Sequence, residues 1–517
     1  MRHVEVRAGA YADSVTLMQV TVKAQAVAGV GAALVAMATT LNLELLADLG
    51  LDAPAGAGPN ELLIAIQADD GESLATALAA VDNALSARPA DEAGGAAEQL
   101  PRTTLSAVRR TGAGLALISV PGQFAFTEAA DALDAGCDVM IFSDNVPVEQ
   151  EIWLKDRAAE LGLLVMGPDC GTAIVGGIGL GFSHTVPAGP IGLVAASGTG
   201  AQQVVCLLDA AGAGVSAVLG LGGRDLSAAV GGRSARAALA ALDEDPATEL
   251  IVLLSKPPAD EVADGLREYA TSLATPVQFA LVGPGQPDLT AAAEAALRAT
   301  GQPVPVWPTW GAPRGDPGGR PCGSAPRGDP GGRPPGSALR GLFAGGTLCD
   351  EAMVIAAERL GPVYSNIPLR PEWRLDARSP GDESGARHTM IDFGDDDLTA
   401  GRPHPMIDQR LRTDRLAAEA ANPATAVIML DVVLGHGAHP DPASELAPAI
   451  AAARTAGAGR GLAVVVSLIG ARSDPQGLTA QANALAEAGA RVFASNAQAA
   501  TFARELTGTS TRAGGLS

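Results

Sequence analysis

Two short turns of glycine and hydroxyl residues, far apart in the chain, each join an apolar strand-like run to an apolar helix-like run. The first turn lies in Ala196–Gly200 (ASGTG) and the second in Phe343–Thr347 (FAGGT). Such a turn leaves the first N–H groups of its helix free at the positive end of the helix dipole, and this arrangement binds anions, most often phosphate. Two of these turns predict a phosphate or acyl phosphate held between two helix N-termini. The residues expected to bind it are Ser197, Gly198, Thr199, Gly200, Gly345, Gly346 and Thr347.

The composition limits the classes of partner. The chain has 517 residues, enough for about three or four domains. Its net charge of −22 argues against a nucleic-acid partner, since phosphates require a basic face. Low aromatic content and Ala/Gly-rich surfaces favour assembly with other subunits or with further copies of the chain.

The location of the chain is also predicted from simple features. Residues 24–43 carry no charge, but they are rich in Ala and Gly, so we interpret them as a helix–strand segment and expect no membrane span. The five cysteines lack CxxC spacing and the N-terminus lacks the pattern of a signal peptide, which together favour the cytoplasm.

Strand-like and helix-like runs alternate from about residue 96 onward, which predicts parallel sheets covered by helices on both faces. The fold class is therefore α/β, with several Rossmann-like and flavodoxin-like domains. No GxGxxG motif opens these domains, so NAD is not expected. The expected segments are an N-terminal α/β region (1–95), three α/β domains (96–186, 187–305 and 339–505), a linker (306–338) and a disordered tail (506–517). The linker contains a tandem duplication, APRGDPGGRPCGS followed by APRGDPGGRPPGS, whose Pro and Gly content cannot form a core.

Polar residues follow several predicted strands, at the sheet edge where α/β folds bind ligands. Those expected to bind a substrate are Asn145, Asp169, Gly222, Gly223, Arg224, Asp395, Asp396 and Arg402. Two alternatives stay open for the acidic run at 395–397, which is either a loop for Mg²⁺ or an amide, or a solvated turn. Arg224 and the neighbouring Asp225 either reach the phosphate or form an ion pair between domains.

Two residues are candidates for catalysis, Lys256 and His404. Lys256 follows a strand in Ser255-Lys256-Pro257, and His404 lies between two prolines that restrict its backbone. His404 suits either acid–base chemistry or a structural hydrogen bond. Cys170 is a weaker candidate for a nucleophile, and His436 and His439 are interpreted as loop structure rather than metal ligands, so the metal stays unassigned.

Several of these motifs resemble one enzyme family. Three segments resemble the α subunit of succinyl-CoA synthetases, namely Leu163–Thr172 (LLVMGPDCGT), Ala196–Gly200 and Gly220–Leu226 (GLGGRDL). Three others resemble the C-terminal domain of the β subunit, namely Phe343–Ala352 (FAGGTLCDEA), the loop after Met390-Ile391-Asp392, and Ala426–Gly437. The presence of α-like and β-like segments in one chain resembles the arrangement of the FdrA family. The segment His388–Asp408 (HTMIDFGDDDLTAGRPHPMID) also resembles a signature of that family. The resemblance implies a CoA-binding-like domain at 96–186, a synthetase α-like domain at 187–305 and a β-like domain at 339–505.

The chain also departs from the synthetase pattern. In the synthetases, the two glycine turns hold a phosphohistidine from opposite sides, but here no histidine occurs between His184 and His388. Lys256 stands in the loop where the synthetases carry the glutamate that positions that histidine. The chain is therefore not expected to take phosphate from a nucleotide by the synthetase route.

The resemblance implies two activities. The favoured one is oxamate carbamoyltransferase, which moves a carbamoyl group between oxalurate and phosphate in allantoin breakdown, with phosphate as substrate and a small-molecule acid as its partner. The alternative is acyl-CoA ligase chemistry, with CoA and Mg²⁺ as candidate cofactors, in which another subunit supplies nucleotide and phosphohistidine. A third alternative is a non-catalytic assembly or ligand-sensing subunit.

Overall fold

The computed structural model describes residues 1–8, 10, 14–54, 57–58, 61–86, 101–311, 338–375, 387–399 and 402–508. The contacts divide the chain into two compact units. The first comprises Met1–Arg102 with Thr399–Pro403, and the second comprises Thr103–Leu398 with His404–Ser517. Both duplicated copies of the expected linker, and residues 509–517 of the expected tail, lie outside the described residues.

The first unit is a small antiparallel sheet with helices. Its elements are β1 (Arg2–Arg7), α1 (Ser14–Gln25), β2 (Val30–Met37), α2 (Thr40–Asp48), β3 (Leu62–Ala68) and α3 (Gly71–Ser86). The strand order is β1-β3-β2, and the central strand β3 is almost entirely buried. The uncharged stretch at 24–43 covers the end of α1, all of β2 and the start of α2, as the composition predicts. No helix among the described residues is long and apolar enough to cross a membrane.

The second unit begins with a three-stranded parallel sheet, β4-β5-β6. Its elements are α4 (Thr104–Thr111), β4 (Leu115–Ile118), α5 (Gly122–Asp134), β5 (Asp138–Ile141), α6 (Val148–Leu161) and β6 (Val165–Met166). Helix α4 begins with a capping box in which Thr103 and Ser106 exchange hydrogen bonds.

A six-stranded sheet follows, in the order β12-β11-β9-β10-β7-β8. Its elements are β7 (Thr172–Val175), β8 (Ile178–Gly181), β9 (Ala188–Ala196), α7 (Gly198–Ala210), β10 (Val215–Gly220), α8 (Arg233–Asp243), β11 (Leu250–Ser255), α9 (Asp260–Ala270), β12 (Val277–Leu281) and α10 (Leu289–Ala299). The first four strands in this order are parallel, whereas β7 and β8 form an antiparallel hairpin on β10. This hairpin lies in the 96–186 segment of the sequence but belongs to the sheet of the next domain. Gly220 permits the contact, because a Cβ there would lie 2.4 Å from the Thr172 carbonyl oxygen.

The last sheet has seven strands, in the order β13-β19-β18-β17-β14-β16-β15. Its elements are β13 (Thr309–Trp310), β14 (Ala338–Phe343), α11 (Gly346–Leu360), β15 (Val363–Tyr364), a 3-10 turn (Pro371–Trp373), β16 (His388–Asp392), α12 (Asp396–Thr399), α13 (Arg410–Ala421), β17 (Thr425–Val433), α14 (Pro442–Ala456), a 3-10 turn (Ala458–Arg460), β18 (Ala463–Ile469), α15 (Leu478–Glu487), β19 (Arg491–Phe493) and α16 (Asn496–Gly508). Every residue of β17 is buried, as expected for a parallel strand covered on both faces. The parallel-sheet α/β class predicted from the sequence is therefore confirmed.

Two details differ from the predicted segment boundaries. β13, at the start of the expected linker, pairs with β19, because the strand carries Trp310 onto the sheet edge. Helix α16 continues to Gly508, into the expected tail.

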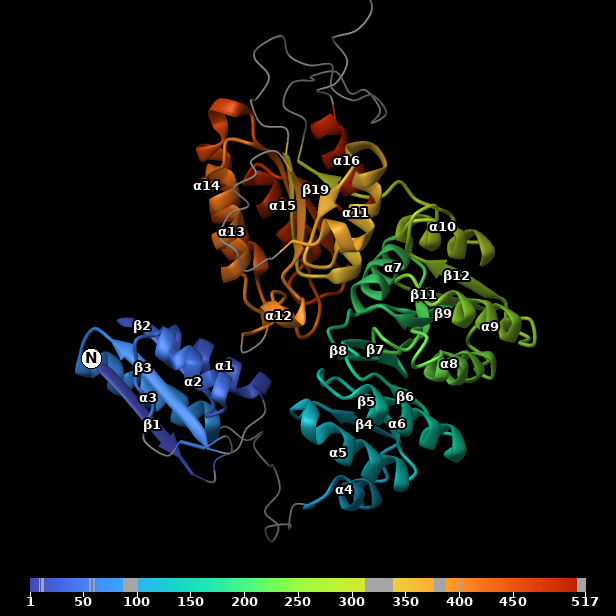
Figure 1. Cartoon of the computed structure of the whole chain (residues 1–517), viewed down its shortest axis with the longest axis horizontal. Helices are drawn as coiled ribbons and strands as arrows, with labels where there is room; N and C mark the ends of the chain where they lie inside the picture. The colour runs from blue at the N-terminus through green and yellow to red at the C-terminus, as the bar shows by residue number, and fades with distance from the viewer. Residues whose placement is uncertain are drawn as a thin grey trace, which may run out of the picture. The chain divides into compact units, whose positions relative to one another are not determined.

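The two larger sheets share one hydrophobic core. Residues of α7, α11, α10 and α16 pack together in a single buried cluster that also includes strand residues of both sheets. Figure 1 shows α7 in green and α11 in yellow side by side, and the two helices are in contact. This packing brings the two glycine turns of the sequence to one place.

Candidate functional site

The two glycine turns meet at the N-termini of α7 and α11. Ser197 caps α7, since its Oγ accepts a hydrogen bond from the Gly200 N–H at 3.1 Å. The same Oγ lies 2.6 Å from Oγ1 of Thr347 in α11. A Cβ on Gly345 would lie 2.6 Å from Cγ2 of Thr199, so this contact requires glycine. The turns face each other in direct contact, and the surface opens at the exposed Gly198 and the partly exposed Gly346.

A buried ion pair holds the second turn in place. Asp431, in β17, accepts hydrogen bonds from the N–H groups of Ala344 at 2.7 Å and Gly345 at 2.9 Å. Arg412, in α13, lies 2.6 Å from Asp431, and both side chains are fully buried. Sequence analysis did not identify this pair, because its members belong to separate elements and contact only in the fold.

Lys256 and Asp392 converge on Gly346, the first residue of α11. A Cβ on Gly346 would lie 3.0 Å from Nζ of Lys256 and 2.7 Å from Oδ2 of Asp392. The lysine also lies 3.5 Å from Oδ2 of Asp350, and its side chain is 40% exposed. Burial lowers the pKa of Lys256, whereas the negative charges of Asp350 and Asp392 raise it. The upward effects together are larger, so the pKa is raised and the ammonium stays protonated.

Asp392 is another residue that the sequence analysis did not identify as part of the site. It ends β16, its side chain is buried, and Oδ1 accepts a hydrogen bond from the Gly394 N–H at 2.9 Å. Within the described part of the chain, Oδ2 makes no hydrogen bond. Burial raises the pKa of Asp392 to about 7 although the charge of Lys256 opposes the shift. This carboxyl therefore exchanges its proton near neutral pH.

His404 lies beside Asp392. Its Nδ1 accepts a hydrogen bond from the Met406 N–H at 3.2 Å, and a Cβ on Gly394 would lie 2.8 Å from its Nε2. Burial, and then the charge of Arg412, lower the pKa of His404 to about 4. The ring is therefore neutral at physiological pH, and the acceptor role of Nδ1 assigns its hydrogen to Nε2. His404 can therefore donate a hydrogen bond through Nε2, but it does not take up or release a proton near neutral pH.

Most of the expected substrate-binding loops approach the same region. Burial raises the pKa of Asp169, and the negative charges of Asp396 and Asp144 raise it further. The positive charges of Lys256 and Arg224 lower this pKa. Gly222 packs on the loop of Asp169, since a Cβ there would lie 2.0 Å from the Pro168 carbonyl oxygen. A Cβ on Gly223 would lie 3.7 Å from Oδ2 of Asp169.

Two residues of these loops, Asn145 and Asp169, have positive φ values of 53° and 57°. Such backbone costs free energy in residues other than glycine and is concentrated at functional sites. The two outliers thus mark the loops that follow β5 and β6, as the position of these loops after parallel strands predicts.

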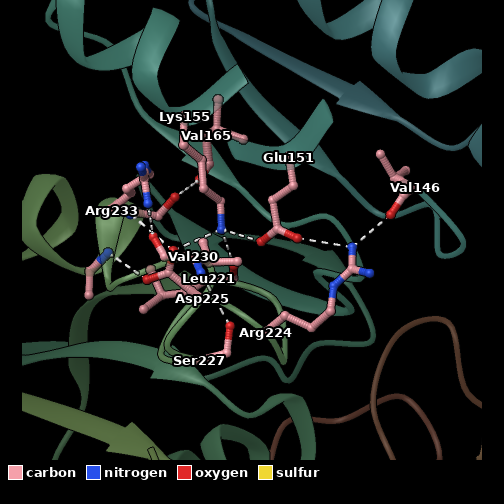
Figure 2. A network of polar contacts seen from close by, with 12 residues as sticks. Val146, Glu151, Lys155, Val165, Leu221, Arg224, Asp225, Ser227, Val230 and Arg233 are labelled. Atoms are coloured by element: carbon pink, nitrogen blue, oxygen red, sulfur yellow. Dashed lines mark hydrogen bonds and ion pairs between the residues drawn. The ribbon is translucent and has the colours of Figure 1, made fainter. Parts of the chain in front are cut away.

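Arg224 and Asp225 take part in a polar network between the first parallel sheet and the six-stranded sheet (Figure 2). Lys155, from α6, is buried and lies 2.7 Å from Glu151 and 2.8 Å from Asp225. Arg224 lies 2.9 Å from the other oxygen of Glu151 and donates a hydrogen bond to the Val146 carbonyl oxygen at 2.8 Å. This geometry corresponds to the ion-pair alternative. The Arg224 side chain nevertheless remains 44% exposed.

Other candidates have different surroundings. Arg402 is exposed and belongs to the Thr399–Pro403 segment of the first unit, so it is not assigned to this site. Asp395 accepts a hydrogen bond from the Asp397 N–H at 3.1 Å and forms the turn before α12.

In the described ranges, no group of three or more His, Cys, Asp or Glu residues is arranged to hold a metal ion. Burial raises the pKa of Cys170 to about 12, which leaves its thiol unreactive.

The histidines interpreted as loop structure each contact another side chain, Thr185 in a loop for His436 and Glu445 in α14 for His439. Nε2 of His436 lies 3.0 Å from Oγ1 of Thr185, and Nε2 of His439 lies 3.4 Å from Glu445.

Two family models match the chain. Residues 342–506 match the CoA-ligase family, and residues 1–101 match the AllF heavy metal-associated domain. The AllF-type match covers the N-terminal region to which the sequence assigned no role.

Similar proteins include relatives of the whole chain and of part of it. The uncharacterised protein YahF of Escherichia coli (strain K12) is 38% identical over 526 residues, which cover 97% of this chain and 98% of YahF. The alpha subunit of the ADP-forming succinate–CoA ligase of Aquifex aeolicus is 31% identical over 160 residues, or 30% of this chain and 51% of that subunit. The chain thus spans about half the length of that ligase subunit.

Among solved structures, the dinucleotide-forming acetyl-coenzyme A synthetase 1 of Ca. Korarchaeum cryptofilum, in complex with phosphate and ADP, shares 15% identity. The match covers 76% of this chain and 82% of that chain, with a TM-score of 0.28. The match to YahF extends over nearly all of both proteins, and the CoA-ligase and AllF-type models account for the two ends of the chain. The chain therefore belongs to the FdrA-like family of succinyl-CoA synthetase-like proteins.

Proposed function

We propose that this chain is a subunit of an enzyme that transfers a carbamoyl group between oxalurate and phosphate. One observation carries the proposal: the N-termini of α7 and α11 are in contact beside Lys256, in a chain with no histidine between residues 185 and 387. The AllF-type match at residues 1–101 supports the assignment to allantoin breakdown.

Phosphate would bind at the rim of the contact between the two turns. Asp431 occupies the N–H groups of Ala344 and Gly345, so the N–H groups that follow, at Gly346 and Thr347, would face the anion. The ammonium of Lys256 would supply a positive charge there, and preorganised donors of this kind stabilise charge that develops during group transfer.

The reaction then needs no covalent intermediate on the protein. An oxygen of phosphate would attack the carbamoyl carbon of oxalurate, and the bond from that carbon to the oxamate nitrogen would break. The nitrogen leaves as the amide of oxamate after it takes up the proton that phosphate loses, and carbamoyl phosphate is formed.

The surroundings do not suit a phosphohistidine. His184, which is buried, is held by Asp474 at 2.7 Å, and His404 is neutral with its Nδ1 occupied. The loops after β5 and β6, which the resemblance associates with CoA, carry the carboxylates Asp144 and Asp169, with Asp396 near them. These carboxylates would oppose a bound pyrophosphate, whereas the charges of Lys256 and Arg224, which also act on Asp169, would favour it.

Turnover of the purified chain, together with any subunits that copurify with it, tests the proposal. We expect oxalurate and inorganic phosphate to give carbamoyl phosphate and oxamate without nucleotide or CoA. Omission of phosphate should stop the reaction. Product formation that requires both ATP and CoA would contradict the proposal.

The second candidate function is acyl-CoA ligase chemistry with a partner that supplies nucleotide and phosphohistidine. The CoA-ligase match at residues 342–506 and the similarity to ligase alpha subunits favour it. Tight binding of CoA and copurification of a nucleotide-binding subunit would support this candidate. If the chain served only in assembly or ligand sensing, changes at Lys256 would leave the activity of the complex intact.

A further inference from the structure

We propose that Asp392 shares one proton with the bound oxyanion, so that the site selects protonated oxyanions such as hydrogen phosphate over sulfate. This inference rests on the proposed function, because it concerns the same phosphate site.

The position of Asp392 is the first step of the argument. Its Oδ2 and the Lys256 Nζ lie 2.7 Å and 3.0 Å from the position that a Cβ on Gly346 would take. Both groups therefore lie next to the first residue of α11, within reach of an anion that accepts hydrogen bonds from the start of this helix. Only 5% of Asp392 is exposed, and no hydrogen bond to its Oδ2 is found among the described residues. This oxygen is not one of the fully buried polar atoms that lack a partner, so a ligand can still reach it.

The neighbours of Asp392 leave it as the group that exchanges a proton. Lys256 has a raised pKa, and His404 has a pKa of about 4, so neither changes charge near neutral pH. Burial also raises the pKa of Asp350 and of Asp431, but each of these carboxylates has a cation as partner, Lys256 for Asp350 and Arg412 for Asp431. The groups that face Asp392 from each packed element are Lys256 after β11, Cys349 and Asp350 in α11, His404, Arg412 in α13 and Asp431 in β17.

The chemistry of the two oxyanions supplies the selection. An ionised carboxylate can only accept a hydrogen bond, and hydrogen phosphate has an O–H to donate whereas sulfate has none near neutral pH. Sulfate can bind only when Asp392 itself carries the proton. Binding to sulfate should therefore weaken as pH rises through the pKa of Asp392, while phosphate continues to bind by bringing its own proton.

The contact between phosphate and Asp392 also explains how the proton of phosphate could reach the oxamate nitrogen. The O–H of the attacking phosphate would donate to Oδ2 of Asp392, and this proton would pass to the oxamate nitrogen as the carbon–nitrogen bond breaks. Protons balance, because the one that phosphate loses is the one that oxamate gains, and Asp392 returns to its ionised form.

Calorimetric titration of the full chain with inorganic phosphate and with sulfate, at pH 6 and pH 8.5 and constant ionic strength, tests the inference. For a carboxyl with a pKa of about 7, the protonated fraction falls about 30-fold between these values. We expect the affinity for sulfate to fall by about that factor, and the affinity for phosphate to change much less. Asp392→Asn, which keeps the size of the side chain and an oxygen for the Gly394 N–H, should bind sulfate equally at both pH values.

Glu351→Gln is the matched control, because Glu351 is also a buried carboxyl with a pKa raised to about 7, but its hydrogen-bond partners are Leu289 and Asn496. This variant should discriminate between the anions as the wild type does. Discrimination that survives in Asp392→Asn, or that disappears in Glu351→Gln, would overturn the inference while phosphate binding still supports the proposed function. Failure of the wild type to bind phosphate at either pH would overturn the proposed function itself, and this inference with it.

Discussion

At the scale of single residues, Lys256 decides between direct transfer to phosphate and the synthetase route. The sequence identifies it because it stands in the loop where the synthetases carry a glutamate. Asp350 and Asp392, which set its charge state, come from segments about a hundred residues away and meet it only through the packing of α11 on α7. The residues that support the site could not be predicted for this reason, although two of them lie within quoted motifs, FAGGTLCDEA and HTMIDFGDDD.

Lys256→Glu should lower phosphate-dependent turnover by about 100-fold or more, because it places a negative charge beside an anion and removes a preorganised cation. Lys256→Arg should keep part of the activity, since the charge remains while the geometry changes. Steady-state turnover with varied phosphate measures both effects. Wild-type turnover in Lys256→Glu would show that this lysine does not bind the substrate anion.

Asp431→Asn should destabilise the chain by about 3 kcal/mol, because it leaves the buried guanidinium of Arg412 without a counter-charge. The control is Asp408→Asn, which breaks an ion pair with Arg410, a side chain that is 67% exposed. That change should cost about 1 kcal/mol or less. Urea unfolding of both variants provides the comparison, and equal losses would mean that the buried pair has no special role in holding the second turn.

At the scale of elements, most strands and helices could be predicted from the alternation of apolar runs. Helix α6, for example, occupies Val148–Leu161, and Pro147 and Gly162 bound its apolar pattern. The β7–β8 hairpin was not predicted, because its assignment depends on pairing with β10 and not on local pattern. The contact between the starts of α7 and α11 likewise depends on two segments about 150 residues apart, although the function of the turns as anion sites suggested it.

Gly346→Ala tests the start of α11 as an element. The added Cβ would lie 2.7 Å from Oδ2 of Asp392 and 3.0 Å from Nζ of Lys256, the two groups proposed to contact the oxyanion. We expect phosphate affinity to fall by at least about 10-fold, with some loss of stability, because the Cβ would displace the buried Asp392 carboxyl although alanine is a good helix former. Gly114→Ala is the control, since a Cβ there meets no atom within 4 Å. Unchanged phosphate affinity in Gly346→Ala would place the anion elsewhere.

At the scale of the whole molecule, a buried carboxyl joins three helices and makes stability depend on pH. Glu351, in α11, accepts hydrogen bonds from the Leu289 N–H of α10 at 2.6 Å and from Asn496 of α16 at 2.7 Å. Burial raises its pKa in the folded state to about 7. Because this value lies above that of the unfolded chain, the folded state binds the proton more tightly. The contribution of Glu351 is therefore fully present below about pH 4.5 and is lost as pH rises to about 7.

Glu351→Gln removes this titration. The difference in the urea midpoint of unfolding between the variant and the wild type should shift in favour of the variant as pH rises from 5 to 7. One group can contribute at most about 1.4 kcal/mol per pH unit to the free energy of unfolding. A difference that stays constant with pH would show that Glu351 has an ordinary pKa in the fold.

The account as a whole depends on an oxyanion held at the joined starts of α7 and α11. The most direct measurement is anomalous diffraction from a crystal of the full chain soaked with arsenate, which has the shape, charge and proton of phosphate. We expect an arsenic peak over Gly346, with oxygens in contact with the Lys256 ammonium and the Asp392 carboxyl. A well-ordered site without arsenic there, or an arsenic peak only at other positions, would contradict the account.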